Sequence, residues 1–210
     1  MDKKVINDKV SELLTNTPKK NFTQSVELSI SFSEINMEAP ENKLNLNIIL
    51  PNGRGKDVEI GVFADGDMNV NAKKISKHVL SKRELEDYAT KKRRMRNFAK
   101  ECYSFIAQAD LMTVIGKNWG AVLAPRGKMP QPVPPNADLK TLIDRMKKTV
   151  KIKSKKNPVV HTPVGTADMS AEDLTANIME VLNAIERQIH EDNIKSIYVK
   201  ATMSPPVRIW

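Results

Sequence analysis

The residues that could carry phosphate chemistry in this chain are concentrated in one short glycine-containing turn. The segment LPNGRGK, residues 50–56, places Gly53, Gly55 and Lys56 in an order that occurs in phosphate-binding loops. A loop that surrounds phosphates with backbone amides has the longer GxxxxGK[ST] spacing, which this segment lacks. The segment therefore predicts a turn rather than a nucleotide site.

The histidines and the single cysteine do not form a metal-binding or nucleophilic pattern. His78, His161 and His190 lie far apart, and neither HxxxH nor CxxC spacing occurs, which argues against a structural zinc site. Cys102 lies in the apolar stretch FAKECYSFIA, a setting typical of a small core residue. We predict that the protein is not an enzyme and uses no metal or cofactor.

Two cations lie in a loop whose backbone is restricted by proline and glycine. Arg126 and Lys128 are surrounded by such residues, which favour neither a helix nor a central strand. We expect a loop of specified shape that displays both cations. The restricting residues are Pro125, Gly127, Pro130, Pro132, Pro134 and Pro135.

The composition indicates a basic protein with a polyanionic partner. The 210 residues include 34 lysines and arginines against 25 acidic residues, a net charge of +9. This balance favours nucleic acid or an acidic membrane surface. No apolar run approaches the roughly 20 residues of a membrane span, and MDKKVINDKV contains no apolar signal core. One cysteine fits a reducing compartment, so we expect a soluble intracellular protein.

Both ends of the chain have the pattern of a small α+β domain. Apolar residues at helical spacing predict helices over 3–15 and after Ser170 and Asp173. Alternation predicts strands, the clearest being Ser25–Ser31, with Val26, Leu28 and Ile30 on one face. The other predicted strands are 44–50, 149–153, 158–163 and 196–200. Neither end is large enough to fold alone, so we predict that together they form two helices on a four-stranded sheet.

The middle of the chain has a different hydrophobic pattern from the two ends. An apolar run over 58–64 predicts a strand buried on both faces, and Asp65–Asp67 predicts a turn. Helical patterns follow, one with Val70 and Ile75 and one opening on a Ser81–Glu84 capping box. A further strand is predicted over 103–107, and further helices over 109–123 and 138–146. We predict an inserted doubly wound α/β layer domain, entered and left near Lys56 and Val150, where two chain crossings make a hinge.

Four sequence blocks, in this order, resemble one protein family over essentially the whole chain. They are PNGRGK, FIAQADLMTVIGK with LAPRGKMPQP, HTPVGT, and SIYVKATMSPPVRI. They resemble the large-subunit ribosomal protein family L one, which builds the mobile stalk beside the exit-tRNA site, and the short N-terminus resembles its archaeal branch. The resemblance implies a split two-layer α+β RNA-binding domain, residues 1–54 and 151–210. It also implies an inserted three-layer Rossmann-like α/β domain, residues 55–150, without a nucleotide.

The resemblance also implies the function and the contact residues. We expect a cytoplasmic, ribosomal protein that binds large-subunit rRNA, assists release of deacylated exit-site tRNA, and represses translation of its own mRNA. Off the ribosome we expect a monomer. The rRNA contacts implied for this chain are Phe22, Ser25 and Glu27 at the first strand, and Ser196, Thr202, Met203 and Ser204 at the last. Position 204 departs from the family pattern, in which glycine is usual, and serine adds a side chain there.

The chemistry of these residues suits double-stranded RNA. Proteins read such RNA by its shape, its phosphates and its 2′-hydroxyls, which both donate and accept hydrogen bonds. Short hydroxyl and carboxylate groups such as Ser25 and Glu27 fit that task, while Phe22 and Met203 could pack on ribose or be ordinary core residues. Lys153 and Lys155, with Lys151 and Lys156, are candidates for phosphate contacts.

Three alternatives remain open from the sequence. The basic run 91–96 is either a solvated face or a place of transient contact with tRNA or rRNA. An enzyme could use the inserted domain for a nucleotide or phosphorylated substrate, but a GxGxxG turn after the strand 58–64 is missing. A peripheral membrane protein would need a basic amphipathic anchor with aromatic residues on its apolar face, and no such anchor is found.

Overall fold

The computed structural model describes residues 2–36, 39, 42–135, 137–154 and 156–210. The chain divides into two compact units. We call the first, Met1–Lys56 with Lys148–Trp210, the terminal unit, and the second, Asp57–Lys147, the inserted unit.

Two helices of the terminal unit begin at side-chain caps and bury one apolar stripe each. Helix α1 spans Lys3–Asn16, and the Asp2 carboxylate accepts a hydrogen bond from the Lys4 amide. Helix α7 spans Ala171–Glu186, and the Ser170 hydroxyl accepts from the Asp173 amide at 3.1 Å. These caps satisfy amides that have no partner within the helix. The buried stripes are Ile6, Val10 and Leu13 on α1, and Leu174, Ile178, Val181, Leu182 and Ile185 on α7.

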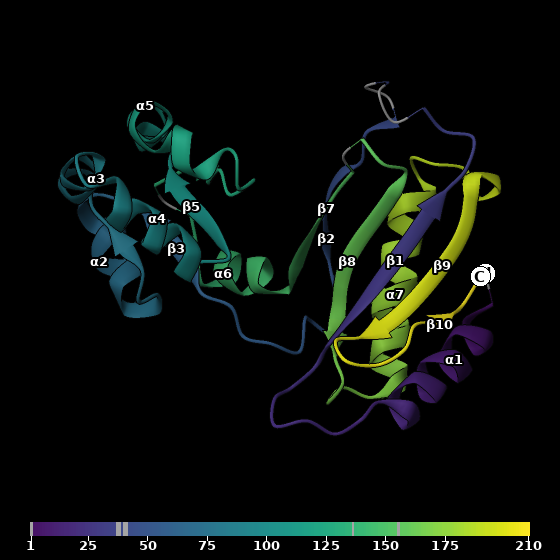
Figure 1. Ribbon diagram of the computed structural model, residues 1–210. Coiled ribbons are helices and arrows are strands. Elements are labelled where there is room, and N and C mark those ends of the chain that lie inside the picture. Colours follow the sequence, from purple (N-terminus) through teal and green to yellow (C-terminus); the bar gives the residue numbers. More distant parts are fainter. Residues whose placement is uncertain (1, 37–38, 40–41, 136, 155) are drawn as a thin grey trace. The chain divides into compact units, whose positions relative to one another are not determined.

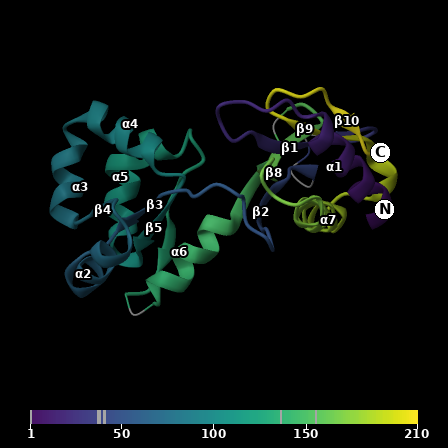
Figure 2. The same cartoon turned by 90° about the horizontal axis from the view of Figure 1, so that it is seen from below.

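These helices lie on one face of a four-stranded antiparallel sheet. Figure 1 shows α7 behind β8, β1 and β9, and Figure 2 shows the unit from below. Val26, Leu28 and Ile30 of β1 are fully buried in the core that contains the helix stripes, as their alternation predicted. The strand order is β10 (Val207–Arg208), β9 (Ile194–Ala201), β1 (Ser25–Phe32) and β8 (Val159–Thr166).

The predicted membership of this sheet was wrong for two strands. β2 (Asn45–Ile49) and β7 (Thr149–Lys153) pair only with each other, as a separate two-stranded ribbon. Their register is locked by Ser154, which donates its amide to the Leu44 carbonyl and accepts from the Leu44 amide. The fourth strand of the sheet is instead β10, whose two residues follow Pro205 and Pro206 and are too short for an alternation signal.

The inserted unit is a three-layer α/β arrangement around a parallel sheet. The sheet order is β4-β3-β5-β6, with every neighbouring pair parallel. Two separate apolar cores cover its two faces, and Figure 2 shows helices on both sides of it. The strands are β3 (Ile60–Phe63), β4 (Val79–Leu80), β5 (Ser104–Gln108) and β6 (Gln131–Val133). One face carries α3 (Lys82–Ala89), α4 (Lys92–Glu101) and α5 (Met112–Leu123), and the other α2 (Gly66–Ile75) and α6 (Leu139–Lys148).

Two local predictions in this unit need correction, and one is confirmed. Val70 and Ile75 do not form the inner face of α2, because their side chains are 57% and 43% exposed and Met68 and Ala72 are buried instead. The predicted turn at Asp65–Asp67 is the start of α2, which begins at Gly66. The Ser81–Glu84 capping box of α3 is present in both directions.

Candidate nucleic-acid interface

The polar face of the four-stranded sheet carries short groups that alternate with the buried core residues. Glu27 pairs across β1 with Lys200 on β9, and Ser29 pairs with Tyr198 on β9 and His161 on β8. Side chains directly opposite each other in an antiparallel pair point to the same face. The face therefore combines hydroxyl, carboxylate, ammonium and ring groups, and Glu27, His161 and Lys200 are exposed.

At one end of this face, the start of β1 and the end of β9 are joined by hydrogen bonds. The Thr202 amide donates to the Ser25 carbonyl at 3.1 Å. The Thr202 hydroxyl accepts from the Ser25 amide at 3.2 Å and donates to the Ser25 carbonyl at 3.3 Å. Residues 177 positions apart in the sequence thus form one surface, which we call the strand-end surface: Phe22, Ser25, Glu27, Thr202 and Met203.

The two large apolar side chains of the strand-end surface are not core residues. Phe22 is 52% exposed and Met203 is 57% exposed. Both side chains are therefore accessible to a partner. The structure thereby excludes the alternative that these two residues are buried in the core.

Gln24 is a residue of this region that the sequence did not indicate. It is only 4% exposed. Its side-chain oxygen accepts from the Met203 amide at 2.9 Å, its side-chain nitrogen donates to the Pro18 carbonyl at 2.6 Å, and its own carbonyl accepts from the Ala167 amide. Gln24 thus holds together three loops distant in sequence. A lone glutamine before a strand carries no local signal of such a role.

Ser196 and Ser204 occupy different positions from the other predicted contacts. Ser196 pairs with Ser31, four residues along β1 from Glu27, which is about 14 Å at roughly 3.4 Å per residue. It lies on the same strands but not in the strand-end surface. Ser204 is 5% exposed, and its hydroxyl accepts from the Ala201 amide at 3.0 Å, so it shapes the loop from inside.

The predicted lysine contacts lie outside the four-stranded sheet. Lys153 is exposed at the end of β7, where it pairs with Asn45 of β2. Lys155 lies outside the described residues. Lys153 therefore belongs to the β2–β7 ribbon rather than to the strand-end surface.

The two cations predicted to be displayed on the proline-rich loop are bound to backbone carbonyls. Lys128 donates from Nζ to the carbonyls of Ala99 and Cys102, at 2.8 and 2.6 Å, and burial lowers the pKa of Lys128. Arg126 donates to the Val122 carbonyl. These contacts anchor the loop to its own unit. Arg126 is exposed, as predicted, whereas Lys128 is half-buried, so the prediction that the loop displays both cations was wrong for Lys128.

The inserted unit has none of the usual arrangements of a catalytic site among its described residues. In doubly wound sheets, ligands bind where the strand order reverses, which is here between β3 and β5. The Gln108 side chain occupies that position by accepting from the Asp65 amide at 3.1 Å. Cys102 is buried, which raises the pKa of its thiol to about 12, so the nucleophilic thiolate does not form near neutrality. No group of metal-binding side chains occurs in the described part of the chain.

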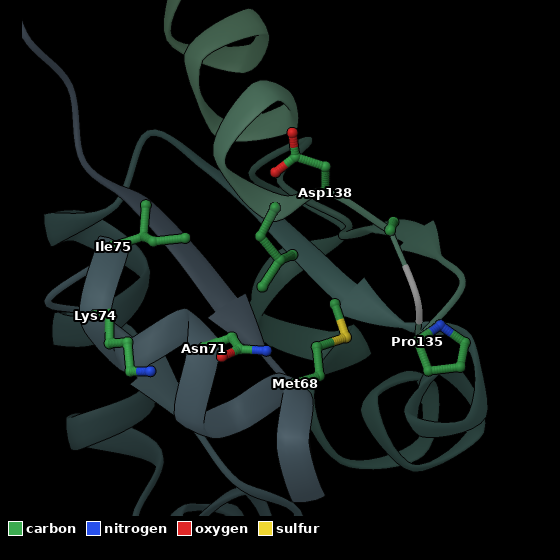
Figure 3. Close-up of a pocket in the computed structure, with 8 residues that line it drawn as sticks. Met68, Asn71, Lys74, Ile75, Pro135 and Asp138 are labelled. Atoms are coloured by element: carbon green, nitrogen blue, oxygen red, sulfur yellow. The ribbon is translucent and has the colours of Figure 1, made fainter.

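A shallow pocket of about 330 Å³ lies between α2 and the start of α6. Figure 3 shows Met68, Asn71, Lys74 and Ile75 of α2 facing this space, with Asp138 at the start of α6. Asp138 accepts hydrogen bonds from the Thr141 hydroxyl and the Lys140 amide, and these bonds lower its pKa. Among the described residues that line the pocket, Asp138 is the only one with a carboxylate, and that carboxylate is engaged as a helix cap. We find no acid–base pair among the residues that line the pocket.

Comparisons with known proteins all lead to one family of ribosomal proteins. A model of the "Ribosomal protein L1p/L10e family" matches residues 13–205. A large ribosomal subunit protein uL1 of Pyrococcus abyssi is 45% identical over 99% of this chain and 96% of its own length. Proteins of the same name are 43% identical in Methanothermococcus thermolithotrophicus, over 100% and 99% of the two chains, and 41% identical in Methanosarcina acetivorans, over 100% of both. No helix in the described residues is both long and apolar enough to cross a membrane.

Proposed function

The chain belongs to the ribosomal protein L1p/L10e family, and from this premise we propose that it binds large-subunit rRNA directly through the strand-end surface. The bound rRNA forms the mobile stalk of the large subunit in the cytoplasmic ribosome. In that position the protein assists release of deacylated tRNA from the exit site. It also represses translation of its own mRNA, by binding a copy of the rRNA site. The family is one of ribosomal structural proteins and not of enzymes.

The observation that carries this proposal is that exposed apolar side chains belong to the same surface as Ser25 and Thr202, which are hydrogen-bonded to each other. Phe22 and Met203 offer apolar area, while Ser25, Glu27 and Thr202 offer donors and acceptors. This mixture suits the shallow groove of an RNA duplex, where ribose surfaces and 2′-hydroxyls are accessible and base edges are not. Because Gln24 and the Ser25–Thr202 bonds hold the loops in place, little ordering is needed on binding.

We assign this binding to the split domain of residues 1–54 and 151–210, with residues 55–150 as the inserted domain. The rRNA site then needs both ends of the chain, since Ser25 and Thr202 come from opposite ends. Ser196 on the same strands and Lys153 on the ribbon would extend the contact along the duplex, with Lys153 near phosphates. Off the ribosome we propose a monomer.

Single substitutions in the strand-end surface test the site. Thr202→Ala and Met203→Ala should each weaken binding of the rRNA fragment, by roughly tenfold to a hundredfold. For Thr202, leaving a buried hydrogen-bond partner unpaired costs about 1–3 kcal/mol. For Met203, full burial of the side chain against RNA is worth about 1.5–3 kcal/mol. About 1.4 kcal/mol corresponds to a factor of ten in affinity. Filter binding to the rRNA fragment and to a scrambled RNA measures the effect, after circular dichroism has established that each variant is folded.

Matched controls separate the site from general effects of substitution. Thr202→Ser keeps the hydroxyl and should keep most of the affinity. Met129→Ala removes a methionine that is 41% exposed in the inserted unit and should leave the affinity unchanged. Wild-type affinity in both folded alanine variants would place the site elsewhere. Log K should also fall by roughly 0.7 to 0.9 per phosphate contact against log salt, and a flat profile would exclude phosphate contacts.

Dividing the chain tests which unit holds the rRNA site. A chain that joins residues 1–54 to 151–210 through a short linker should fold and keep most of the affinity for the rRNA fragment. It retains α1, α7 and the four-stranded sheet. Of the β2–β7 ribbon it retains β2 and residues 151–153 of β7, which pair with residues 45–47. Apart from Val150, the buried residues of the terminal core all remain. The separate inserted domain, about 55–150, should fold but bind the fragment weakly. Tight binding by the inserted domain alone would reverse the assignment.

A further inference from the structure

Helix α4 of the inserted unit presents an exposed surface that is almost entirely cationic. All six of its lysines and arginines, counting the residue at the N-cap, are exposed. Among the described residues, none of them has a side-chain hydrogen bond or an ion pair. The only acidic residue of the helix, Glu101, is 3.7 Å from His78. The six residues, which we call the α4 cations, are Lys91, Lys92, Arg93, Arg94, Arg96 and Lys100.

The α4 cations oppose the stability of the helix that carries them. Four of them, 91–94, lie at the N-cap and in the first turn, where the helix dipole is positive and acidic side chains are favoured. The N-cap residue makes no side-chain hydrogen bond to the helix. Lys92, Arg96 and Lys100 form an i, i+4 row of like charges, which is also unfavourable. These cations therefore do not contribute to the stability of the helix. A bound polyanion would neutralise them and so stabilise it.

The inner face of α4 holds the helix firmly without help from the cations. Met95, Phe98 and Ala99 are buried. The Phe98 ring lies 5.8 Å from the Phe105 ring and 5.9 Å from the Trp119 ring, measured between centroids. The apolar face of α4 is therefore committed to the core of its own unit and is not free to enter a membrane.

The charge of the chain is concentrated away from the proposed rRNA site. Residues 57–147 contain 17 lysines and arginines against 11 acidic residues, an excess of +6. The terminal unit contains 17 against 14, an excess of only +3. Sequence-independent nucleic-acid binding depends mainly on such cations, so the two units are suited to different modes of binding.

We propose that the outer face of α4 binds the phosphate backbone of a second RNA segment, while the strand-end surface holds the first. This inference rests on the proposed function, because it takes the rRNA site to be in the terminal unit. Arg93, Arg96 and Lys100 are exposed on one side of the helix. Along the helix axis, Arg93 and Arg96 are about 4.5 Å apart and Arg96 and Lys100 about 6 Å apart, at roughly 1.5 Å per residue. Such a row matches the repeated charges of a duplex backbone and reads no sequence.

The composition of this surface favours RNA over an acidic protein. The exposed residues of α4 are its cations, Asn97 and Glu101, with no exposed apolar side chain. Protein–protein interfaces have an apolar or aromatic centre and are depleted in lysine. An RNA backbone needs only cations and hydrogen-bond donors. The protein would then connect two RNA segments that do not pair with each other.

The full-length triple variant Arg93→Gln, Arg96→Gln, Lys100→Gln tests the proposal, since glutamine keeps the helix propensity. Affinity for a duplex RNA of arbitrary sequence should fall at least about tenfold, and the slope of log K against log salt should decrease by about three, one for each lost phosphate contact. The matched control is Lys73→Gln, Lys117→Gln, Lys140→Gln, which removes the same charge from exposed positions on α2, α5 and α6. Its affinity for the duplex should stay within about threefold of wild type.

A second variant and a ternary measurement complete the test. Lys92→Glu with Arg93→Glu should weaken duplex binding but raise, or leave unchanged, the thermal midpoint of the inserted unit, because acids suit the first turn. Wild-type protein saturated with the rRNA fragment should still bind the labelled duplex. Equal losses in the triple variant and its control would overturn the proposal, as would competition between the two RNAs. It would also fail if the triple variant lost binding only to an acidic protein or to anionic vesicles.

These outcomes are distinguishable from failure of the proposed function. If the wild-type chain does not prefer the rRNA fragment to a scrambled one, the rRNA site is refuted. The affinities of the α4 variants for the duplex still test the second site in that case, since the duplex has an arbitrary sequence and does not require the rRNA site.

Discussion

Replacing Gly61 by valine is expected to unfold the inserted unit while the terminal unit stays folded. Gly61 lies in β3, one of the two central strands of the parallel sheet. A Cβ atom there would lie 2.4 Å from two carbon atoms of the Phe105 ring and 3.2 Å from the Cys102 sulfur. Phe105 is fully buried and stacked on Phe63 with ring centroids 5.2 Å apart, so the ring cannot move aside. Overpacking typically costs about 1–3 kcal/mol and occasionally more. We expect the upper end here because valine adds three carbon atoms against a ring that cannot move, and that is a large share of a small unit's stability.

Tryptophan fluorescence can follow this loss in one unit only. Trp119 is fully buried in the inserted unit, whereas Trp210 belongs to the terminal unit. In a Trp210→Phe background, Gly61→Val should shift or abolish the Trp119 unfolding transition. Gly116→Ala is the matched control, because nothing lies within 4 Å of a Cβ at that helical position, and it should stabilise the unit by about 0.5–1 kcal/mol. An unchanged Trp119 transition in Gly61→Val would show that the sheet can relax around the added atoms.

The same variant also tests the assignment of functions to units. If the rRNA site lies in the terminal unit, Gly61→Val should keep its affinity for the rRNA fragment within about threefold. Binding of duplex RNA should decrease, since α4 packs on the Phe105 side of the sheet. Loss of fragment binding with an intact terminal unit would show that the inserted unit contributes to the specific site.

Replacing Asn177 by alanine is expected to destabilise the terminal unit by about 3–5 kcal/mol. Asn177 is fully buried on α7. Its amide nitrogen donates to the carbonyls of Gly53 and Val164 at 2.9 and 2.8 Å, and its oxygen accepts from the Asn52 amide at 3.1 Å. Removing these bonds leaves three backbone groups without partners, and each such loss costs about 1–3 kcal/mol. Asn177 thus holds Asn52 and Gly53, which lie just before the chain passes from the terminal unit into the inserted unit.

Chemical denaturation, with hydrogen exchange of β1 and β8 peptides to identify the unit, measures this loss. Asn183→Ala on the exposed side of α7 is the control and should change stability by less than about 0.5 kcal/mol. Asn177→Asp should be at least as harmful as alanine, because a carboxylate cannot donate to two carbonyl oxygens. A loss below about 1 kcal/mol in Asn177→Ala would mean that water replaces the amide.

The sequence alone determined the features that depend on neighbours a few residues away. The alternation of Val26, Leu28 and Ile30 predicted β1 and its buried face, since side chains of a strand alternate by geometry. The caps at Ser81 and Ser170 predicted the starts of α3 and α7, because each hydroxyl reaches an amide three residues on. The resemblance of four blocks led to the family, which the comparisons established.

Only the tertiary structure decided which distant segments meet. The pairing of β2 with β7 in a separate ribbon, and the choice of β10 as the fourth strand, depend on long-range hydrogen bonds that no local period encodes. The same holds for Lys128, whose ammonium group finds two carbonyls over 20 residues away in the sequence, and for Gln24, which joins three loops. A polar side chain takes whichever partner the folded chain brings within reach, so its role is a property of the packing and not of its neighbours in sequence.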